Sequence, residues 1–106
     1  MSEDVIMQLI VHAGNARSAG MEAIQHAKEG RYEAARAALQ EAGEELARAH
    51  QVQTALIQRE AAGERVNMSL LMVHAQDHMM NAMTVKDLAA ELVELYERLA
   101  AGGRRG

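Results

Sequence analysis

The sequence of 106 residues contains no cysteine, no proline, no tryptophan and no phenylalanine, and it has only two tyrosines. Without cysteine the chain cannot form disulfides, use a thiol nucleophile or bind metals through thiolates. The absence also fits a reducing compartment. Because proline is absent, no helix interior is interrupted by one. The core must therefore consist of aliphatic residues, methionine and many alanines, in segments that are free to form long helices.

The charge pattern and the hydropathy exclude several classes of protein. The formal net charge is −4, and the only basic cluster is Arg104-Arg105 near the end of the chain, so we predict no nucleic-acid binding. No apolar run approaches the length of a membrane span, and the acidic start Ser2-Glu3-Asp4 lacks the basic residues of a signal peptide. We therefore expect one cytoplasmic domain, with an alanine-rich core thin enough to favour oligomers.

The spacing of apolar residues predicts three helices. They are expected over about residues 2–29, from residue 32 to 59 or 62, and over about residues 68–101. Ser2 is the expected N-cap of the first helix, and Gly30 the expected left-handed residue that ends it. Three long helices with short links predict an all-α fold, an antiparallel three-helix bundle. Residues 1–101 would form this single domain, followed by a flexible Gly/Arg tail over residues 102–106.

Each predicted helix carries an apolar face. On the first helix it comprises Val5, Leu9, Ala13, Ala16 and Ile24, widened by Ile6 and Ile10. On the second helix it is a coiled-coil-like seam with one polar member, made of Ala35, Leu39, Ala42, Leu46, Ala49, Gln53 and Leu56. On the third helix one line is apolar at its C-terminal end and polar at its N-terminal end. Its members are Leu88, Leu92, Leu95 and Leu99, and then Thr84, Asn81, Asp77 and His74.

Three titratable residues share one face of the third helix within the sequence LMVHAQDHMM, and three interpretations of them remain open. The first is structural: His74, Asp77 and His78 would be hydrogen-bonded core residues, or simply residues exposed at the edge of the apolar stripe. A buried carboxylate is costly unless it is paired, so this interpretation requires a group that neutralises Asp77.

The second interpretation is a metal site. His74 and His78 lie four residues apart, the spacing at which two imidazoles on one helix bind the same cation. The zinc-protease motif has glutamate directly after its first histidine, and Ala75 occupies that position here, so protease chemistry is not supported. A third ligand would have to come from another chain or from one of the remaining histidines, His12, His26 and His50.

The third interpretation is a nucleophile, because a neutral imidazole nitrogen can attack phosphorus near pH 7. Gln76, His78 and Asn81 would supply polar contacts, from the same chain or from a neighbour. The sequence has no Gly-rich phosphate loop, so we expect no nucleotide cofactor. Spacing alone does not choose between the metal site and the nucleophile.

The segment SLLMVHAQDHMMNAMT, Ser69 to Thr84, resembles the signature of the lactose/cellobiose-type (N,N'-diacetylchitobiose-like) enzyme IIA family of the bacterial sugar phosphotransferase system. The resemblance extends to LIVHAGNARSAGMEAIQHAKEGRYEAARAAL near the start, ELARAHQVQTALIQREAAGE in the middle and LAAELVELYERL near the end. Nearly the whole chain is covered. The resemblance implies an antiparallel three-helix bundle that assembles as a homotrimer of nine helices.

The resemblance also implies a role for each matched residue. His74 would be the catalytic histidine that carries a phosphoryl group on Nε2, with Gln76 and His78 as supporting polar neighbours. Asp77 would meet its symmetry copies near the three-fold axis, where a divalent cation such as Mg²⁺ binds. The implied function is that of a phosphocarrier, a component of the phosphotransferase system.

The resemblance further implies the partners. The histidine-containing phosphocarrier protein would donate the group, and a cysteine of a sugar-specific IIB component would accept it for sugar uptake. The membrane would be involved only indirectly, through the IIC component. The absence of cysteine excludes the IIB role for this chain, and nothing in the match fixes the sugar. Two alternatives are a non-catalytic helical trimer that acts as a regulatory or partner-binding module, and a metal-binding trimer.

Overall fold

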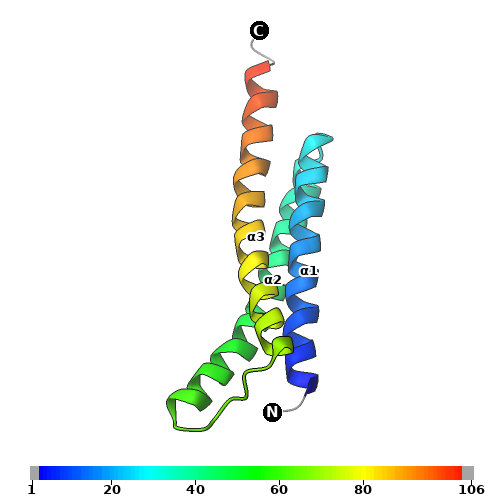
Figure 1. The fold of residues 1–106 in the computed structure, drawn as a ribbon. Helices are drawn as coiled ribbons and strands as arrows, with labels where there is room; N and C mark the ends of the chain where they lie inside the picture. Colours follow the sequence, from blue (N-terminus) through cyan, green and yellow to red (C-terminus); the bar gives the residue numbers. More distant parts are fainter. Residues whose placement is uncertain (1–2, 104–106) are drawn as a thin grey trace.

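The fold, taken from a computed structural model that describes residues 3–103, is an antiparallel bundle of three helices (Figure 1). The helices are α1 (Glu3–Lys28), α2 (Tyr32–Ala61) and α3 (Leu70–Gly103). The bundle is long and narrow, with extents of 62 × 21 × 19 Å. The C-terminal part of α3 extends past the turn between α1 and α2, and the C-terminal part of α2 diverges from the other helices (Figure 1). The predicted all-α three-helix fold is thus confirmed.

The end of α1 follows the local chemistry of the sequence. Gly30 has φ +78°, the left-handed conformation that glycine adopts most easily. Its amide donates to the carbonyl of Ala27 at 3.0 Å, and the amide of Arg31 donates to that of His26 at 2.9 Å. These two bonds form a Schellman motif, which satisfies carbonyls that the helix end would leave free. The predicted stop at Gly30 is therefore confirmed.

The start of α3 differs from the prediction by two residues. The helix begins at Leu70 because Ser69 acts as its N-cap: the Ser69 hydroxyl accepts a hydrogen bond from the Met72 amide at 3.1 Å. At its other end α3 continues to Gly103, two residues beyond the predicted end and into the expected tail. The predicted N-cap Ser2 and the basic pair after Gly103 lie outside the described residues.

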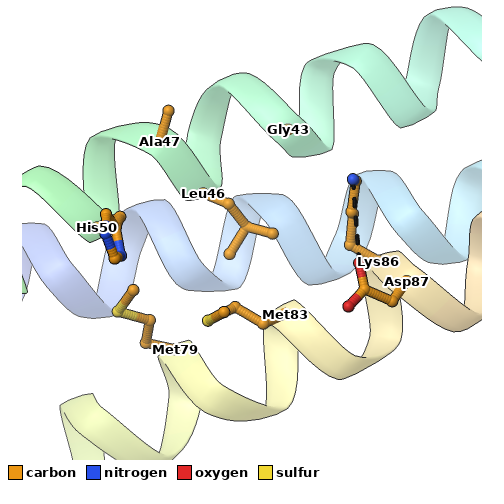
Figure 2. A pocket seen from close by; sticks show the side chains of 8 residues that line it. All are labelled: Gly43, Leu46, Ala47, His50, Met79, Met83, Lys86 and Asp87. Atoms are coloured by element: carbon orange, nitrogen blue, oxygen red, sulfur yellow. Dashed lines mark ion pairs between the residues drawn. The ribbon is translucent and has the colours of Figure 1, made fainter.

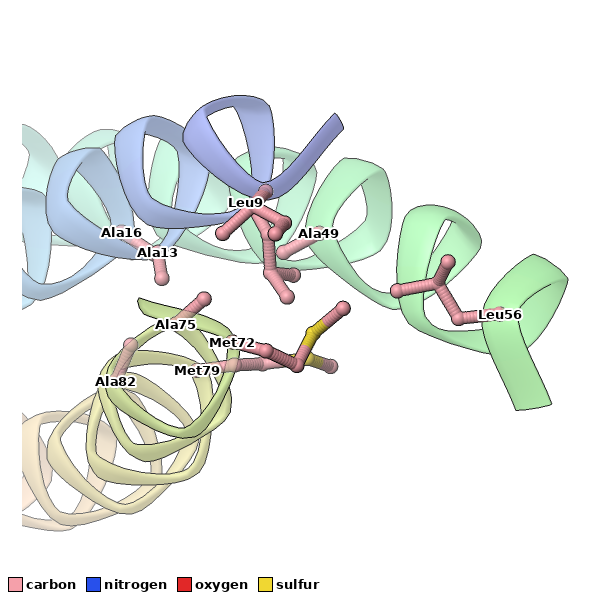
Figure 3. Packing of buried hydrophobic residues seen from close by; sticks show 10 residues of the cluster. Leu9, Ala13, Ala16, Ala49, Leu56, Met72, Ala75, Met79 and Ala82 are labelled. Atoms are coloured by element: carbon pink, nitrogen blue, oxygen red, sulfur yellow. The ribbon is translucent and has the colours of Figure 1, made fainter. Parts of the chain in front are cut away.

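α1 packs extensively against both α2 and α3, whereas α2 and α3 contact each other less. The larger buried cluster joins all three helices and is made mostly of alanine, with Leu9 and Met79 as its largest fully buried side chains (Figure 3). At Gly20, where α1 faces α3, a Cβ atom would lie 3.4 Å from the Val85 side chain, an ordinary van der Waals contact, so alanine would fit there as well. Small residues thus set the close approach of the helices.

α3 has two apolar faces, and only one of them is buried in the bundle. The buried face packs on α1 and α2 and consists of Met72, Ala75, Met79, Ala82, Ala89 and Val93. The predicted leucine line lies on another face and is exposed, with Leu88 at 57%, Leu92 at 36%, Leu95 at 51% and Leu99 at 62%. Its polar continuation is exposed as well, at His74, Asp77, Asn81 and Thr84. The whole line is therefore available to another molecule.

Helix length alone would permit a membrane span, since the three helices have 26, 30 and 34 residues. Within residues 3–103, however, every helix lacks a stretch that is both long enough and apolar enough to cross a bilayer.

Candidate functional site

His74 and His78 lie on adjacent turns in the N-terminal half of α3 and contact each other directly. Their Nε2 atoms are 3.1 Å apart, and the two rings meet edge to face with centroids 4.5 Å apart and planes at 84°. A neutral imidazole has one N–H and one lone pair, so this contact requires one ring to donate and the other to accept. His74 is exposed and His78 is half-buried. The exposed member of the pair, His74, is therefore within reach of another molecule.

The surroundings of His74 are apolar and open. His74 lines a shallow depression together with Leu70 and Leu71, and Leu70 is 87% exposed. Val73, the residue before His74, is half exposed too. Exposed apolar side chains that gather around a reactive group are typical of a surface that contacts another protein.

Gln76 faces α2 and does not join the two histidines of its own chain. Its amide oxygen accepts a hydrogen bond from the Gln53 amide at 2.6 Å, and its amide nitrogen approaches the sulfur of Met72 at 3.9 Å. This bond explains why Gln53 interrupts the apolar seam of α2. Within the described chain Gln76 has no hydrogen bond to His74, so the expected support would have to come from a neighbouring chain.

Asp77 lies exposed on the same side of α3 as His74. Within residues 3–103 its carboxylate forms neither a hydrogen bond nor an ion pair, and no polar or charged side chain of this part is fully buried. The structural interpretation is therefore wrong for a single chain in the form in which Asp77 is a buried core residue, whereas the form in which it is simply exposed at the edge of the apolar line agrees with the structure. The carboxylate remains solvated, and no partner is required.

The other histidines lie away from the pair. His12 bonds to Glu45, and His26 accepts a hydrogen bond from Arg31 at 3.3 Å. In the part of the chain that the structure describes, no three His, Asp or Glu side chains gather to bind a metal ion. The expectation that a further histidine of the same chain completes a metal site with His74 is therefore wrong, because the helices hold these histidines at separate places.

His50 lies at one end of a hollow of about 300 Å³ between α2 and α3 (Figure 2). Leu46, Met79 and Met83 line its middle, and Lys86 and Asp87 lie at the other end. His74 is not among the lining residues. His50 thus belongs to this hollow and not to the site around His74.

His12 and Glu45 form the shortest link between α1 and α2 that involves a charge. Nδ1 of His12 lies 2.6 Å from a carboxylate oxygen of Glu45, and both side chains are largely buried, with 28% and 15% exposed. Since a carboxylate only accepts, Nδ1 must carry the hydrogen. The hydrogen bond from His12 is the main reason that the pKa of Glu45 lies below its usual value near 4.5.

We expect Glu45→Gln to lower the free energy of unfolding by about 1 kcal/mol at pH 7, the usual scale for a hydrogen bond to a partly buried charge. Because folding lowers the pKa of Glu45, this stabilisation is complete above about pH 4.5 and is lost as the pH falls through the folded pKa. The difference in the free energy of unfolding between the wild type and Glu45→Gln should therefore shrink as the pH falls below about 4.5. Urea unfolding at several pH values measures it. Glu44→Gln, a neighbouring exposed carboxylate, is the control, and an equal effect of both variants would contradict the prediction.

The family relationship follows from a comparison with known proteins. The family described as "PTS system, Lactose/Cellobiose specific IIA subunit" matches residues 4–97, which include most of all three helices and the whole site. The chain belongs to this family. It is therefore a IIA component of a sugar phosphotransferase system, a protein of the phosphotransfer class, as the resemblance of the segment around His74 implied.

Individual relatives agree with this family. The lichenan-specific phosphotransferase enzyme IIA component of Bacillus subtilis is 63% identical over 97 residues, which are 92% of this chain and 88% of the relative. The crystal structure of the cellobiose-specific enzyme IIA from Bacillus anthracis is 51% identical, with a TM-score of 0.92 over 95% of this chain and 94% of that chain. The IIA(Chitobiose) structure solved in a complex with HPr, from Escherichia coli, is 42% identical, with a TM-score of 0.81 over 92% and 95%.

Proposed function

We propose that this IIA component carries a phosphoryl group on Nε2 of His74. The observation that supports this most directly is the exposure of His74 beside a second imidazole, whose Nε2 lies 3.1 Å away. A neutral imidazole is nucleophilic near pH 7. Because His74 is exposed, a protein donor reaches it without opening the bundle.

The transfer step balances without an added reactant. In the reactive tautomer, Nδ1 of His74 carries the hydrogen, and the Nε2 lone pair accepts the N–H of His78. The N–H of His78 first moves off this lone pair, which then forms a bond to phosphorus while the P–N bond to the donor histidine breaks. The electron pair of that bond returns to the donor nitrogen, and the donor leaves as a neutral imidazole because its other nitrogen carries a hydrogen, as Nδ1 of His74 does. No proton has to pass between the two imidazoles. The N–H of His78 becomes free to donate to a phosphoryl oxygen, and Gln76 supports the site only if it comes from a neighbouring chain.

The proposed donor is the histidine-containing phosphocarrier protein, because a relative that is 42% identical was solved in a complex with HPr. The proposed acceptor is a cysteine of a IIB component, on which an S–P bond replaces the N–P bond. The sugar then meets the IIB and membrane IIC components and need not touch this chain. Relatives named for lichenan, cellobiose and N,N'-diacetylchitobiose all match, so the sugar is left open.

We also propose that the chain functions as a homotrimer through the exposed line on α3. Four exposed leucines follow one another at helical spacing, and monomers rarely leave so continuous an apolar strip in water. Burial of this strip among three copies of α3 would add the apolar core that the alanine-rich bundle lacks. The same line would bring Asp77 from each chain toward the three-fold axis and place His74 near a subunit boundary.

We further propose that this trimer binds a divalent cation at its axis. Three carboxylates about 4 Å apart would repel one another by roughly 4 kcal/mol per pair at an effective dielectric constant of 20. The exposed Asp77 carboxylate, with no partner in the described part of its own chain, fits a hard cation such as Mg²⁺, which prefers oxygen ligands. The cation would serve assembly and not the transfer step.

We expect Asp77→Leu to be tolerated or stabilising in a trimer, because it removes the axial repulsion and adds apolar surface. The thermal midpoint in the presence of a chelator should rise or stay unchanged, whereas Mg²⁺ should stabilise only the wild type. Asp87→Leu, an exposed aspartate away from the line, is the control. A clear loss of trimer in Asp77→Leu would show that the carboxylate itself holds the assembly together.

The function is tested by incubating the protein with the general phosphotransferase proteins and phosphoenolpyruvate. We expect one acid-labile phosphate per chain, detected by the mass of the intact protein. Without any uptake the phosphocarrier function is wrong or lost, and the alternative of a regulatory, partner-binding trimer would take its place.

A further inference from the structure

The two histidines of the site approach each other in a way that phosphoryl transfer alone does not require. Their Nε2 atoms, and not their Nδ1 atoms, are the atoms in contact, at 3.1 Å. Both rings come from consecutive turns of one helix, so the helix itself holds them at this separation. His74 is exposed and His78 is half-buried, so the pair lies at the surface of α3.

This separation matches the one that two imidazoles adopt on a single metal ion. With Zn–N bonds of about 2.0–2.1 Å, two ligands at the tetrahedral angle place their nitrogens roughly 3.3 Å apart, and two ligands at a right angle roughly 2.9 Å apart. The observed 3.1 Å lies between these values. For a metal ion to bind both Nε2 atoms, the hydrogen on the donating ring moves to Nδ1 of that ring, so that each Nε2 offers a lone pair to the ion.

We propose that His74 and His78 form a two-histidine site for Zn²⁺, with water completing the coordination. Imidazole nitrogens select zinc over magnesium, so this site differs in chemistry from a carboxylate site at Asp77. In residues 3–103 no third His, Asp or Glu gathers with the pair, and a site with two protein ligands binds its ion reversibly. It is therefore a site for exchangeable zinc and not a structural zinc site.

Zinc at this site would regulate phosphorylation, an inference that rests on the proposed function of His74. The metal occupies the Nε2 lone pair that would attack phosphorus, so one His74 nitrogen cannot hold both zinc and a phosphoryl group. Zinc binding and phosphoryl uptake are then mutually exclusive, and free zinc lowers the rate of uptake.

Zinc binding is tested first by competition with a chromogenic chelator, using untagged, unphosphorylated protein. We expect one Zn²⁺ per chain. His78→Gln and His74→Gln should each weaken binding by more than about tenfold, since even the loss of an outer hydrogen-bond partner reaches that scale in metal sites. The matched controls are His26→Gln and His50→Gln. Asp77→Leu tests whether zinc binds the axial carboxylate instead of the two histidines. Equal losses in the controls, binding that survives His78→Gln, or binding lost in Asp77→Leu would each overturn the assignment.

The effect of zinc on transfer is measured next, as the ratio of uptake rates with and without zinc for each variant. Zinc should slow phosphoryl uptake by the wild type, whereas the uptake rate of His78→Gln should be the same with and without zinc. Equal slowing of both proteins would place the inhibition on the donor proteins and contradict regulation at this site. Uptake without zinc binding would refute the metal site alone, and zinc binding without any uptake would refute the phosphocarrier function alone.

Discussion

Replacing His74 by glutamine is expected to reduce the uptake of acid-labile phosphate to background, a loss of at least about a thousandfold. Losses of this size or larger follow the removal of a covalent nucleophile in other enzymes. The amide nitrogen of glutamine has no available lone pair, so no N–P bond can form, although the side chain keeps its polarity. Because His74 is exposed, the substitution should leave the bundle intact. Intact-protein mass after incubation with the donor proteins measures the uptake, and circular dichroism checks the fold.

The controls for this experiment come from the chain itself. His26→Gln and His50→Gln remove imidazoles that lie away from the pair and should retain full uptake. His78→Gln tests the neighbouring ring and should slow the reaction without abolishing it, since glutamine also offers an N–H to a phosphoryl oxygen. Acid-labile phosphate on His74→Gln would show that another residue is the nucleophile.

The helix ends show which local features can be predicted from sequence. Gly30 was identified as a stop because a left-handed residue after a charged helix end favours glycine, and its φ of +78° agrees. The third helix was expected from about residue 68, which would place Ser69 inside it, whereas the Ser69 hydroxyl caps α3 through the Met72 amide. A capping serine is distinguished from a loop serine by one hydrogen bond, and the sequence LLMV after it does not reveal the bond.

The core of α3 could not be identified from side-chain size. The leucines mark the exposed line, whereas the buried face is made of Met72, Met79, Val93 and three alanines. The buried residues do follow spacings of three and four, apart from one gap of seven between Ala82 and Ala89, so a helical pattern was present. The leucine line obscured this pattern, because a core residue is usually expected to be large. Here the buried alanines permit close helix approach, and the leucines remain for another surface.

The geometry of the site was predictable within one helix and not between helices. Spacing placed His74 and His78 together, and the 3.1 Å contact agrees. The Gln53–Gln76 and His12–Glu45 bonds join different helices, and they depend on the rotation of each helix about its axis. The spacing of residues within one helix carries no information about that rotation. The role of His74 came from the family resemblance, because spacing alone left a metal site and a nucleophile equally open.

The exposed leucines lead to the second large prediction: the double substitution of Leu92 and Leu95 by glutamate should dissociate the proposed trimer. Full burial of an exposed leucine contributes roughly 1.5–3 kcal/mol, and Leu92 and Leu95 still expose 36% and 51% of their surface in the single chain, so six substituted side chains per trimer remove roughly 6 kcal/mol of association free energy. The introduced carboxylates would also repel one another near the axis. A loss of this size exceeds the difference between nanomolar and micromolar affinity, which is about 4 kcal/mol.

Sedimentation velocity over a range of protein concentrations measures this effect. The wild type should sediment as a trimer, and Leu92→Glu/Leu95→Glu as a monomer that remains helical, since both leucines are exposed in the single chain. The control is Met21→Glu, because Met21 is an exposed apolar residue on α1, outside the line. It should remain trimeric. A wild type that is monomeric at every concentration would refute the trimer, and with it the axial role of Asp77, but not phosphoryl transfer through His74, because both imidazoles of the contact belong to one chain.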